Sequence, residues 1–165
     1  MTQNYLIGGS VCAVLAVLAF WGMWRSWNRR QRQGDALVAA LTPVTGAAQQ
    51  KFERVLYVVT HPAAQPLVRV SLPGLIYRGY ATVTVHSDGL KVAIPGENET
   101  AIGAIHRITT CQSSLAKTVE KDGLVEVHWR AGEQALVSVF RLPSAAQQKE
   151  FINLVTSNIE GTGQC

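Results

Sequence analysis

Histidine is the residue type best suited to binding a metal or acting as a general base near neutral pH, and this sequence contains four. They lie in different strand-like segments, at His61, His86, His106 and His128. The alternation of apolar and polar residues places His86 and His128 on the polar side of their strands, as solvated residues would be. A metal site needs three or four ligands close together, and the spacing of these histidines does not predict such a convergence.

The other reactive side chains are also isolated. The carboxylate pairs Glu97 with Glu99 and Glu120 with Asp122 fall in or beside turns, where charged side chains are normally solvated. The three cysteines, at positions 12, 111 and 165, have no metal-ligand or redox spacing, which favours a reducing compartment. The sequence has no GxxxxGK(S/T), GxSxG, HExxH or CxxC motif. We therefore predict no enzymatic activity, no bound cofactor and no bound metal.

Binding is the chemistry that the charged residues could still perform. Several arginines occur near the ends of predicted strands, where a subset could converge on an anionic ligand or a partner. Partial burial of their aliphatic stems against glutamate neighbours is the alternative role. The candidate residues for anion or partner binding are Arg69, Arg78, Arg107, Arg130 and Arg141.

The elements that must position these side chains begin with a long apolar segment. Residues 5–24, YLIGGSVCAVLAVLAFWGMW, contain no charge, and as a helix they would extend ~30 Å, about the thickness of a hydrocarbon core. A signal peptide would carry its basic residues before the apolar run, whereas here they follow it. We therefore expect a transmembrane helix over residues 5–24 rather than a signal peptide or a buried core helix.

A basic segment follows the expected span. Arginines come directly after it and none precede it, which predicts an outside amino terminus and a cytoplasmic carboxy-terminal domain, in a single-pass protein of the plasma membrane. Indole rings favour the boundary between bilayer and water, and arginines favour anionic headgroups. The expected membrane-interface residues are Trp21, Trp24, Arg25, Trp27, Arg29, Arg30 and Arg32.

The net charge of +4 does not indicate a nucleic-acid partner. The four arginines of the basic segment account for it, because the remaining Lys and Arg residues equal the 11 Asp and Glu residues in number. A nucleic-acid-binding domain would show a basic stripe or cluster, and residues 33–165 show neither.

The soluble part is expected to follow a linker. Residues 1–33 hold the span and the basic segment, 34–50 a short helical extension and a tether, and 51–165 the domain. In the domain, short β-branched and aromatic runs alternate with turn signals. These runs predict strands at 52–60, 66–72, 80–86, 90–94, 104–112 and 133–142, and a hairpin within 117–130 that turns at Asp122-Gly123.

The last segment has helical periodicity. Ser144 and Gln147 form an S-x-x-Q capping box, apolar residues then recur at helical spacing, and Gly161 ends the helix. Such a helix buries its apolar stripe most simply against the open end of a curled sheet. The sequence thus predicts an α+β, mainly β, fold in which about seven antiparallel strands form a barrel or sandwich capped by a carboxy-terminal α-helix.

Three runs in the domain resemble a known family. They are GLIYRGYATVTVHSDGLKV, AIGAIHRI and KDGLVEVHWRAGEQALVSVFR, and they lie within residues 53–156. Together with the layout of span, arginines, linker and domain, they are similar to actinobacterial single-pass membrane proteins with a cytoplasmic PH-like domain. That family is often labelled transporter or export protein. The resemblance implies a seven-stranded PH-like barrel plugged by a helix, and no established catalytic residues.

These inferences lead to one functional expectation and two alternatives. We expect a membrane-tethered PH-like scaffold at the cytoplasmic face, non-enzymatic, which binds a protein partner by an exposed sheet edge or by the face bearing Tyr77 and Tyr80. The alternatives are a sensor of anionic lipids and an accessory subunit or regulator of a transport or cell-envelope complex. The expected partners are the lipid bilayer and a membrane or cytoplasmic protein, and no nucleic acid.

Overall fold

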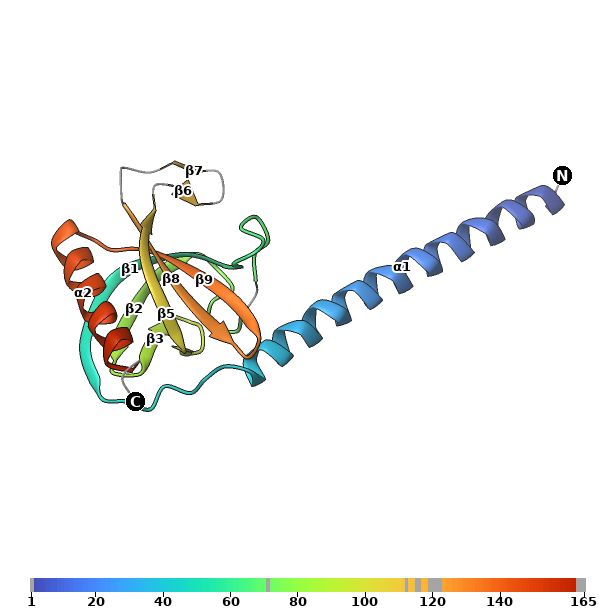
Figure 1. Ribbon diagram of the computed structural model, residues 1–165. Helices are drawn as coiled ribbons and strands as arrows, with labels where there is room; N and C mark the ends of the chain where they lie inside the picture. The colour runs from blue at the N-terminus through green and yellow to red at the C-terminus, as the bar shows by residue number, and fades with distance from the viewer. Residues whose placement is uncertain (1, 71, 112, 115–116, 119–122, 163–165) are drawn as a thin grey trace. The chain divides into compact units, whose positions relative to one another are not determined.

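The computed structural model describes residues 2–70, 72–111, 113–114, 117–118 and 123–162, with side chains at 13–28, 37–70, 72–111 and 123–161. The chain divides into two compact units, Met1–Ala36 and Leu37–Cys165. Figure 1 labels the helices and strands in chain order.

Helix α1 (Thr2–Ala39) makes up the first unit, and its last residues, Leu37–Ala39, belong to the second. In the part of the chain that the structure describes, no helix combines the length and the apolar character needed to cross a membrane. The predicted transmembrane helix over residues 5–24 is therefore wrong. Within α1 the apolar run is not a separate element, because the same helix continues through the arginine-rich segment.

The second unit is built on one seven-stranded antiparallel sheet, whose strand order is β4-β3-β2-β1-β9-β8-β5. Its curled form and the carboxy-terminal helix α2 (Ala145–Thr162) are seen in Figure 1. This part of the predicted fold is confirmed. Strands β6 (Ser113–Ser114) and β7 (Lys117–Thr118) form a separate hairpin. The sheet strands are β1 (Ala48–Pro62), β2 (Gly79–His86), β3 (Gly89–Ala93), β4 (Thr100–Gly103), β5 (Ile105–Cys111), β8 (Leu124–Ala131) and β9 (Gln134–Arg141).

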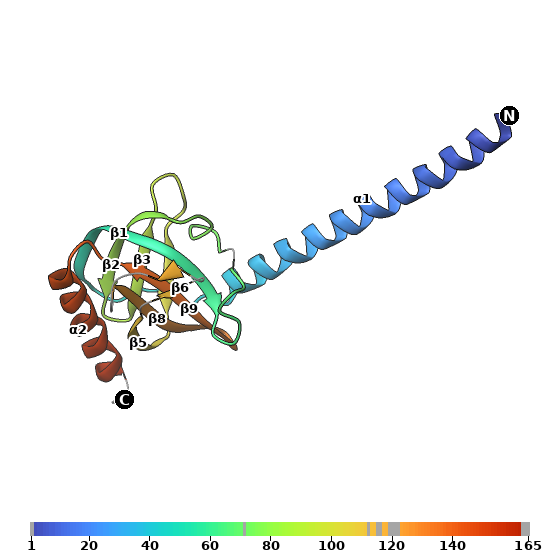
Figure 2. The same ribbon diagram turned by 90° about the horizontal axis from the view of Figure 1, so that it is seen from above.

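Strand β1 belongs to both halves of the sheet. Its first part pairs with β2 and its second part with β9, so that Leu56 lies between Tyr80 on one side and Arg141 on the other. The register shifts at three places along β1, and Arg54, with φ 57°, lies in the shift between Phe52 and Val55. Such bulges bend a strand and increase its twist. Figure 2 shows β1 as the long, curved strand that results.

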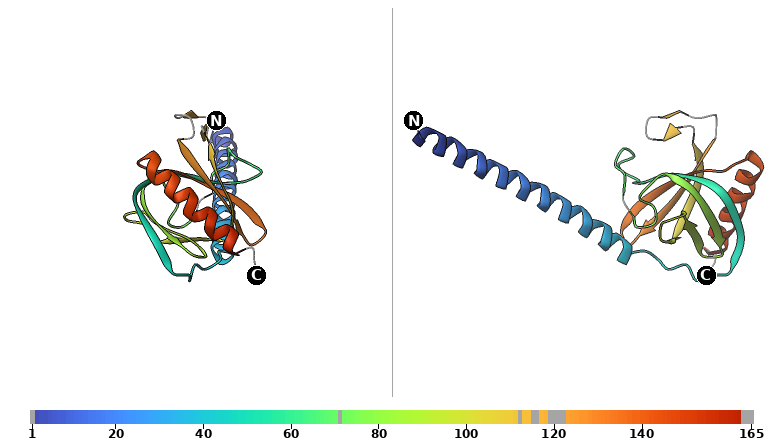
Figure 3. Two further views of the ribbon diagram at one scale, coloured as in Figure 1. Left: turned by 60° about the vertical axis from the view of Figure 1, so that its left-hand side comes forward. Right: turned by 180° about the vertical axis from the view of Figure 1, so that it is seen from behind.

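The inward side chains of the curled sheet form the main core, and α2 closes it. The ring of Phe151 on α2 packs edge-on against that of Phe52 on β1, with 5.3 Å between centroids. Phe151 and Val155 are both buried, and burying such side chains stabilises a fold by roughly 1.5–3 kcal/mol each. The predicted cap is also present, since Ser144 Oγ accepts the Gln147 N–H at 3.3 Å. Figure 3 shows α2 lying across the side of the sheet.

Two local features differ from the predictions, and a third prediction is only partly covered by the described residues. The described residues of 66–72 form no strand and belong to the connection between β1 and β2. Conversely, the short strand β4 was not predicted. The hairpin expected at Asp122-Gly123 lies partly outside the described residues, which resume at Gly123.

Candidate interaction surface

The connection between β1 and β2, described at residues 63–70 and 72–78, is attached to the curled sheet by buried contacts. Leu72 and Leu75 are fully buried in the main core. The hydroxyl of Thr100 donates to the carbonyl of Pro73 at 2.6 Å, and the Tyr57 hydroxyl donates to the carbonyl of Leu75 at 3.1 Å. The connection is therefore held at several points and does not rely on its own secondary structure.

The same connection and the start of β2 expose a group of large apolar side chains, here called the apolar surface. The most exposed of them, Leu67, retains 78% of its accessible area. Among the described side chains from residue 37 onwards, every large hydrophobic side chain in the exposed class belongs to this surface except Val38. The apolar surface consists of Leu67, Val68, Ile76, Tyr77 and Tyr80.

Two of the candidate arginines lie within this segment. Arg69 and Arg78 are both exposed, and the sequence from Arg54 to Ser87 contains no Asp or Glu. Arg69 also interacts with the buried hydroxyl of Tyr57. Burial raises the pKa of Tyr57, although its interactions with Thr60 and Arg69 oppose the increase. Arg69 is therefore partly engaged inside the domain, whereas Arg78 has no ion pair with any described residue.

The other three candidate arginines lie on other parts of the sheet. Arg107 on β5 is opposite His128 on β8. Arg130 and Arg141 are at opposite ends of the β8–β9 hairpin, where Arg130 pairs with Ala135, so they are separated by about 20 Å of strand. The structure therefore does not gather the five arginines into one anion site.

Arg141 lines a groove of about 400 Å³ at the junction of β9 and α2. Lys149 on α2 lines the same groove. Sequence reasoning did not select Lys149, because a lysine within an amphipathic helix carries no signal of its own. Only the fold brings Lys149 to the same groove as Arg141, the last residue of β9.

One of the two histidines that were predicted to be solvated, His86, is buried in the structure. His86 is buried, with 8% exposure, and its Nδ1–H donates to the carbonyl of Gly46 at 2.8 Å. His128 lies on the outer side of β8, where its Nε2 is 3.2 Å from Thr109 Oγ1 and 3.6 Å from Glu126 Oε2. Among the side chains that the structure describes, no group of three His, Cys, Asp or Glu residues could hold a metal.

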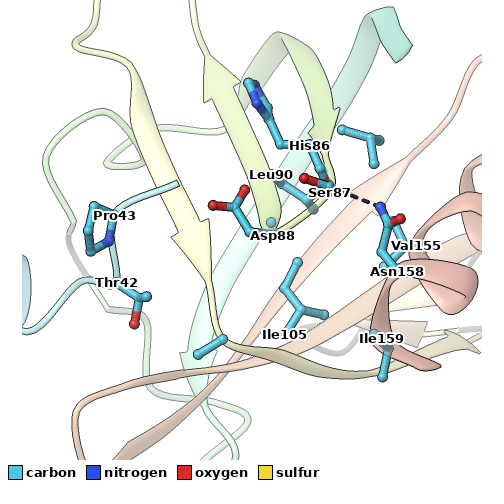
Figure 4. Close-up of a pocket in the computed structure, with 13 residues that line it drawn as sticks. Thr42, Pro43, His86, Ser87, Asp88, Leu90, Ile105, Val155, Asn158 and Ile159 are labelled. Atoms are coloured by element: carbon cyan, nitrogen blue, oxygen red, sulfur yellow. Dashed lines mark hydrogen bonds between the residues drawn. The ribbon is translucent and has the colours of Figure 1, made fainter. Parts of the chain in front are cut away.

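A second pocket, of about 280 Å³, lies between the β2–β3 turn and the end of α2. Figure 4 shows Thr42 and Pro43 on one side of it and Asn158 and Ile159 on the other. Most of its lining is aliphatic, and among the described residues that line it Asp88 is the charged one. The Asn158 amide donates to the carbonyl of His86 at 3.0 Å, which joins α2 to the turn.

Asp88 fastens residues 42–47, here called the strap, to the β2–β3 turn. Its Oδ2 accepts the N–H groups of Thr45 and Gly46, both at 2.7 Å. Burial acts to raise the pKa of Asp88, but these N–H bonds outweigh it and the pKa is lowered. The carboxylate is thus occupied in holding the strap, which lies in the segment predicted as a linker.

The aromatic residues of α1 form the remaining candidate group. Trp21, Trp24 and Trp27 are exposed, and the guanidinium of Arg25 lies 5.8 Å from the ring centroid of Trp21. This distance is within the range of a cation–π interaction. The side chains of Arg29, Arg30 and Arg32 are outside the described ones. The predicted role of all seven residues at a membrane interface stays a prediction.

The comparison with known proteins finds a family match that begins where the second unit begins, at Leu37. The model of one family, described as bacterial PH domain-like, matches residues 37–156. No curated protein matches the chain. Among solved structures it is similar to a Vav1 chain, in a structure of Vav1 inhibited by an allosteric inhibitor that blocks GEF activity. That likeness has a TM-score of 0.42 and 10% identity over 82% of this chain, which spans only 34% of the Vav1 chain. The family match covers most of the protein, and the chain therefore belongs to the bacterial PH domain-like family.

Proposed function

We propose that this domain is a non-enzymatic interaction module that binds a protein partner through the apolar surface. PH-like domains are modules for binding protein or lipid, and membership of the family supports this general class. The observation that carries the choice of surface is the concentration of exposed large hydrophobic side chains between Leu67 and Tyr80.

Exposed large apolar side chains that follow one another along one connection mark a candidate interaction site, and tyrosine is enriched in the centres of protein interfaces. The connection that carries them is anchored by buried Leu72 and Leu75. A surface that is already ordered loses less conformational entropy when a partner binds. The apolar surface therefore has both the composition and the rigidity of a binding site.

A lipid headgroup would require several cations in one place. Near the apolar surface the structure supplies Arg69, which also interacts with Tyr57, and Arg78. Arg107 and Arg130 lie on other strands, and Arg141 lies two strands away from Tyr80. The arrangement therefore favours a protein partner, and the anionic-lipid sensor is the alternative that the experiment must separate.

The test begins with a photo-crosslinking amino acid in place of Tyr77 in the full chain, expressed in its own cells, and a second variant of the full chain with the crosslinker in place of Val38. A partner of this surface should be captured from position 77 and not from position 38. With the captured protein purified, the double variant Tyr77→Ser/Tyr80→Ser should bind it roughly 30-fold more weakly, as expected for two interface anchors. Val38→Ser should bind it normally.

Two results would contradict the proposal. One is equal binding of the partner by the double variant and the parent protein. The other is binding of the full chain to phosphatidylserine vesicles that depends on Tyr77 and Tyr80 without any captured protein. The plasma-membrane location was predicted from the span over residues 5–24 and is not part of this proposal. The accessory role in a transport or cell-envelope complex stays a prediction, which the identity of the partner would decide.

A further inference from the structure

We infer that the groove at the junction of β9 and α2 binds an acidic group carried by a segment of the same protein partner. This inference rests on the proposed function, because it extends the apolar surface across the outer face of the sheet. The groove, of about 400 Å³, is lined by Arg141 from the end of β9 and by Ser144, Gln148, Lys149 and Asn153 from the start of α2 and the residue before it. Its volume suits a side chain or a small anionic group.

The groove has a consistent charge. Among the described residues that line it, Arg141 and Lys149 are the charged ones, and none is Asp or Glu. Neither cation forms an ion pair with a residue that the structure describes. Both side chains are exposed, so each remains available to a ligand. Two cations that no described residue compensates favour an oxyanion at this groove, either carboxylate or phosphate.

The position of the groove relative to the apolar surface follows from the strand register. Leu56 on β1 pairs with Tyr80 on β2 and with Arg141 on β9. Neighbouring strands are about 4.8 Å apart, so Tyr80 and Arg141 start from backbone positions roughly 10 Å apart. Leu56 is partly exposed between them. A row of aromatic, aliphatic and cationic side chains therefore crosses three strands.

This row sets the chemistry of the partner. An extended chain advances about 3.3 Å per residue, so a segment with an apolar residue against Tyr80 reaches Arg141 about three residues further along. The expected partner segment therefore carries an apolar or aromatic residue and, about three residues away, an Asp, a Glu or a phosphorylated residue. The partly apolar row that leads from Tyr80 through Leu56 to the groove favours a protein segment, and the vesicles in the test below provide the comparison with a lipid headgroup.

The test uses the full chain labelled with ¹⁵N and three probes. The first is inorganic phosphate and the third is phosphatidylserine vesicles. The second is a short peptide with one tryptophan and a run of three glutamates that begins three residues after it. The peptide should shift the backbone amide signals of residues 141–149 and of Tyr80, and phosphate should shift those of 141–149 alone. Arg141→Gln/Lys149→Gln should weaken peptide binding about tenfold, and raising the salt concentration should weaken binding to the parent protein. Arg130→Gln is the matched control, because Arg130 is exposed but lies at the other end of the hairpin.

The inference is overturned if the double variant binds the peptide as tightly as Arg130→Gln does, or if only vesicles shift these signals. Retention of the α2 amide signals in the double variant would show that the helix is intact. Failure of the inference can be told apart from failure of the proposed function. A captured partner that needs Tyr77 and Tyr80 but not Arg141 and Lys149 contradicts the groove alone, whereas a partner that needs neither pair contradicts both.

Discussion

The hydroxyl of Tyr57 donates a hydrogen bond to the backbone carbonyl of Leu75, 3.1 Å away. The same hydroxyl is 2.9 Å from Thr60 Oγ1, which in turn is 2.8 Å from Ser138 Oγ. The indole N–H of Trp129 donates to Ser138 Oγ at 3.0 Å. A buried polar network thus ties the connection that carries the apolar surface to three strands of the barrel.

This network makes Tyr57→Phe informative. The substitution keeps the ring but leaves the Leu75 carbonyl without its donor, and an unsatisfied buried polar group costs ~1–3 kcal/mol. We expect urea unfolding to show a loss of this size, with faster amide exchange in residues 72–78 than in α2. Tyr80→Phe, at an exposed position, should change neither quantity. Unaltered exchange in Tyr57→Phe would show that the network does not hold the connection.

Asp88 should make the attachment of the strap sensitive to acid. Because its pKa is lowered in the folded protein, the stability it contributes is fully present above the ordinary carboxyl pKa of 3.8 and is lost as the pH falls through the lower folded value. Asp88→Asn should cost about 1 kcal/mol at pH 7, a value discounted for solvent exposure. The difference between the two proteins should shrink in unfolding experiments below pH 4, and a constant difference across the range would contradict this role.

His128 should respond to acid in a milder range. Burial lowers its pKa below the ordinary 6.5; the carboxylate of Glu126 opposes this shift, while Arg107, His106 and His61 add to it. Neutral His128 therefore stabilises the fold fully above pH 6.5, and this contribution is lost as the pH falls through the lower folded pKa. In an NMR titration, Glu126→Gln should lower the pKa of His128 further and Arg107→Gln should raise it. Shifts in the reverse directions would show that other groups control this histidine.

The strap also depends on a close approach between backbones. A Cβ added at Gly103 would lie 2.9 Å from both Cβ and the carbonyl oxygen of Thr42. Gly103→Ala should therefore displace the strap and destabilise the domain by ~1–3 kcal/mol in urea unfolding. The pKa of Asp88 should at the same time move back towards its ordinary value. Gly161→Ala is the control, because its added Cβ would meet nothing within 4 Å; an equal loss there would discount the contact with Thr42.

Local sequence signals were sufficient to predict elements whose start and buried face can be read from neighbouring residues in the sequence. The cap at Ser144 and the helical spacing of Phe151 and Val155 predicted α2 correctly, because capping and amphipathic periodicity are local properties. The strict alternation in residues 80–86 predicted β2 for the same reason. The predicted face of Tyr77 and Tyr80 is also exposed in the structure.

Signals that depend on distant partners were misread or missed. Residues 66–72 have strand-like composition, but Leu72 is apolar because it is buried in the main core and not because it lies in a strand. The polar face of β2 suggested a solvated His86, whereas the strap covers it. The pairing of Arg141 with Lys149 in one groove depends on how α2 leaves the sheet, and no spacing in the sequence encodes that direction.

The long strand β1 has a consequence for the order of events during synthesis. Its second half pairs with β9, which ends at Arg141. The paired residues of β1 and β9 are therefore separated by about eighty positions in the sequence. Contacts of such long range are slow to form. While a ribosome is still translating β8, the second half of β1 has no strand beside it, and the network from Tyr57 to Ser138 cannot close. A nascent or prematurely terminated chain would therefore display Tyr77 and Tyr80 without the framework that fixes them, and recognition of a partner would begin only near the end of translation.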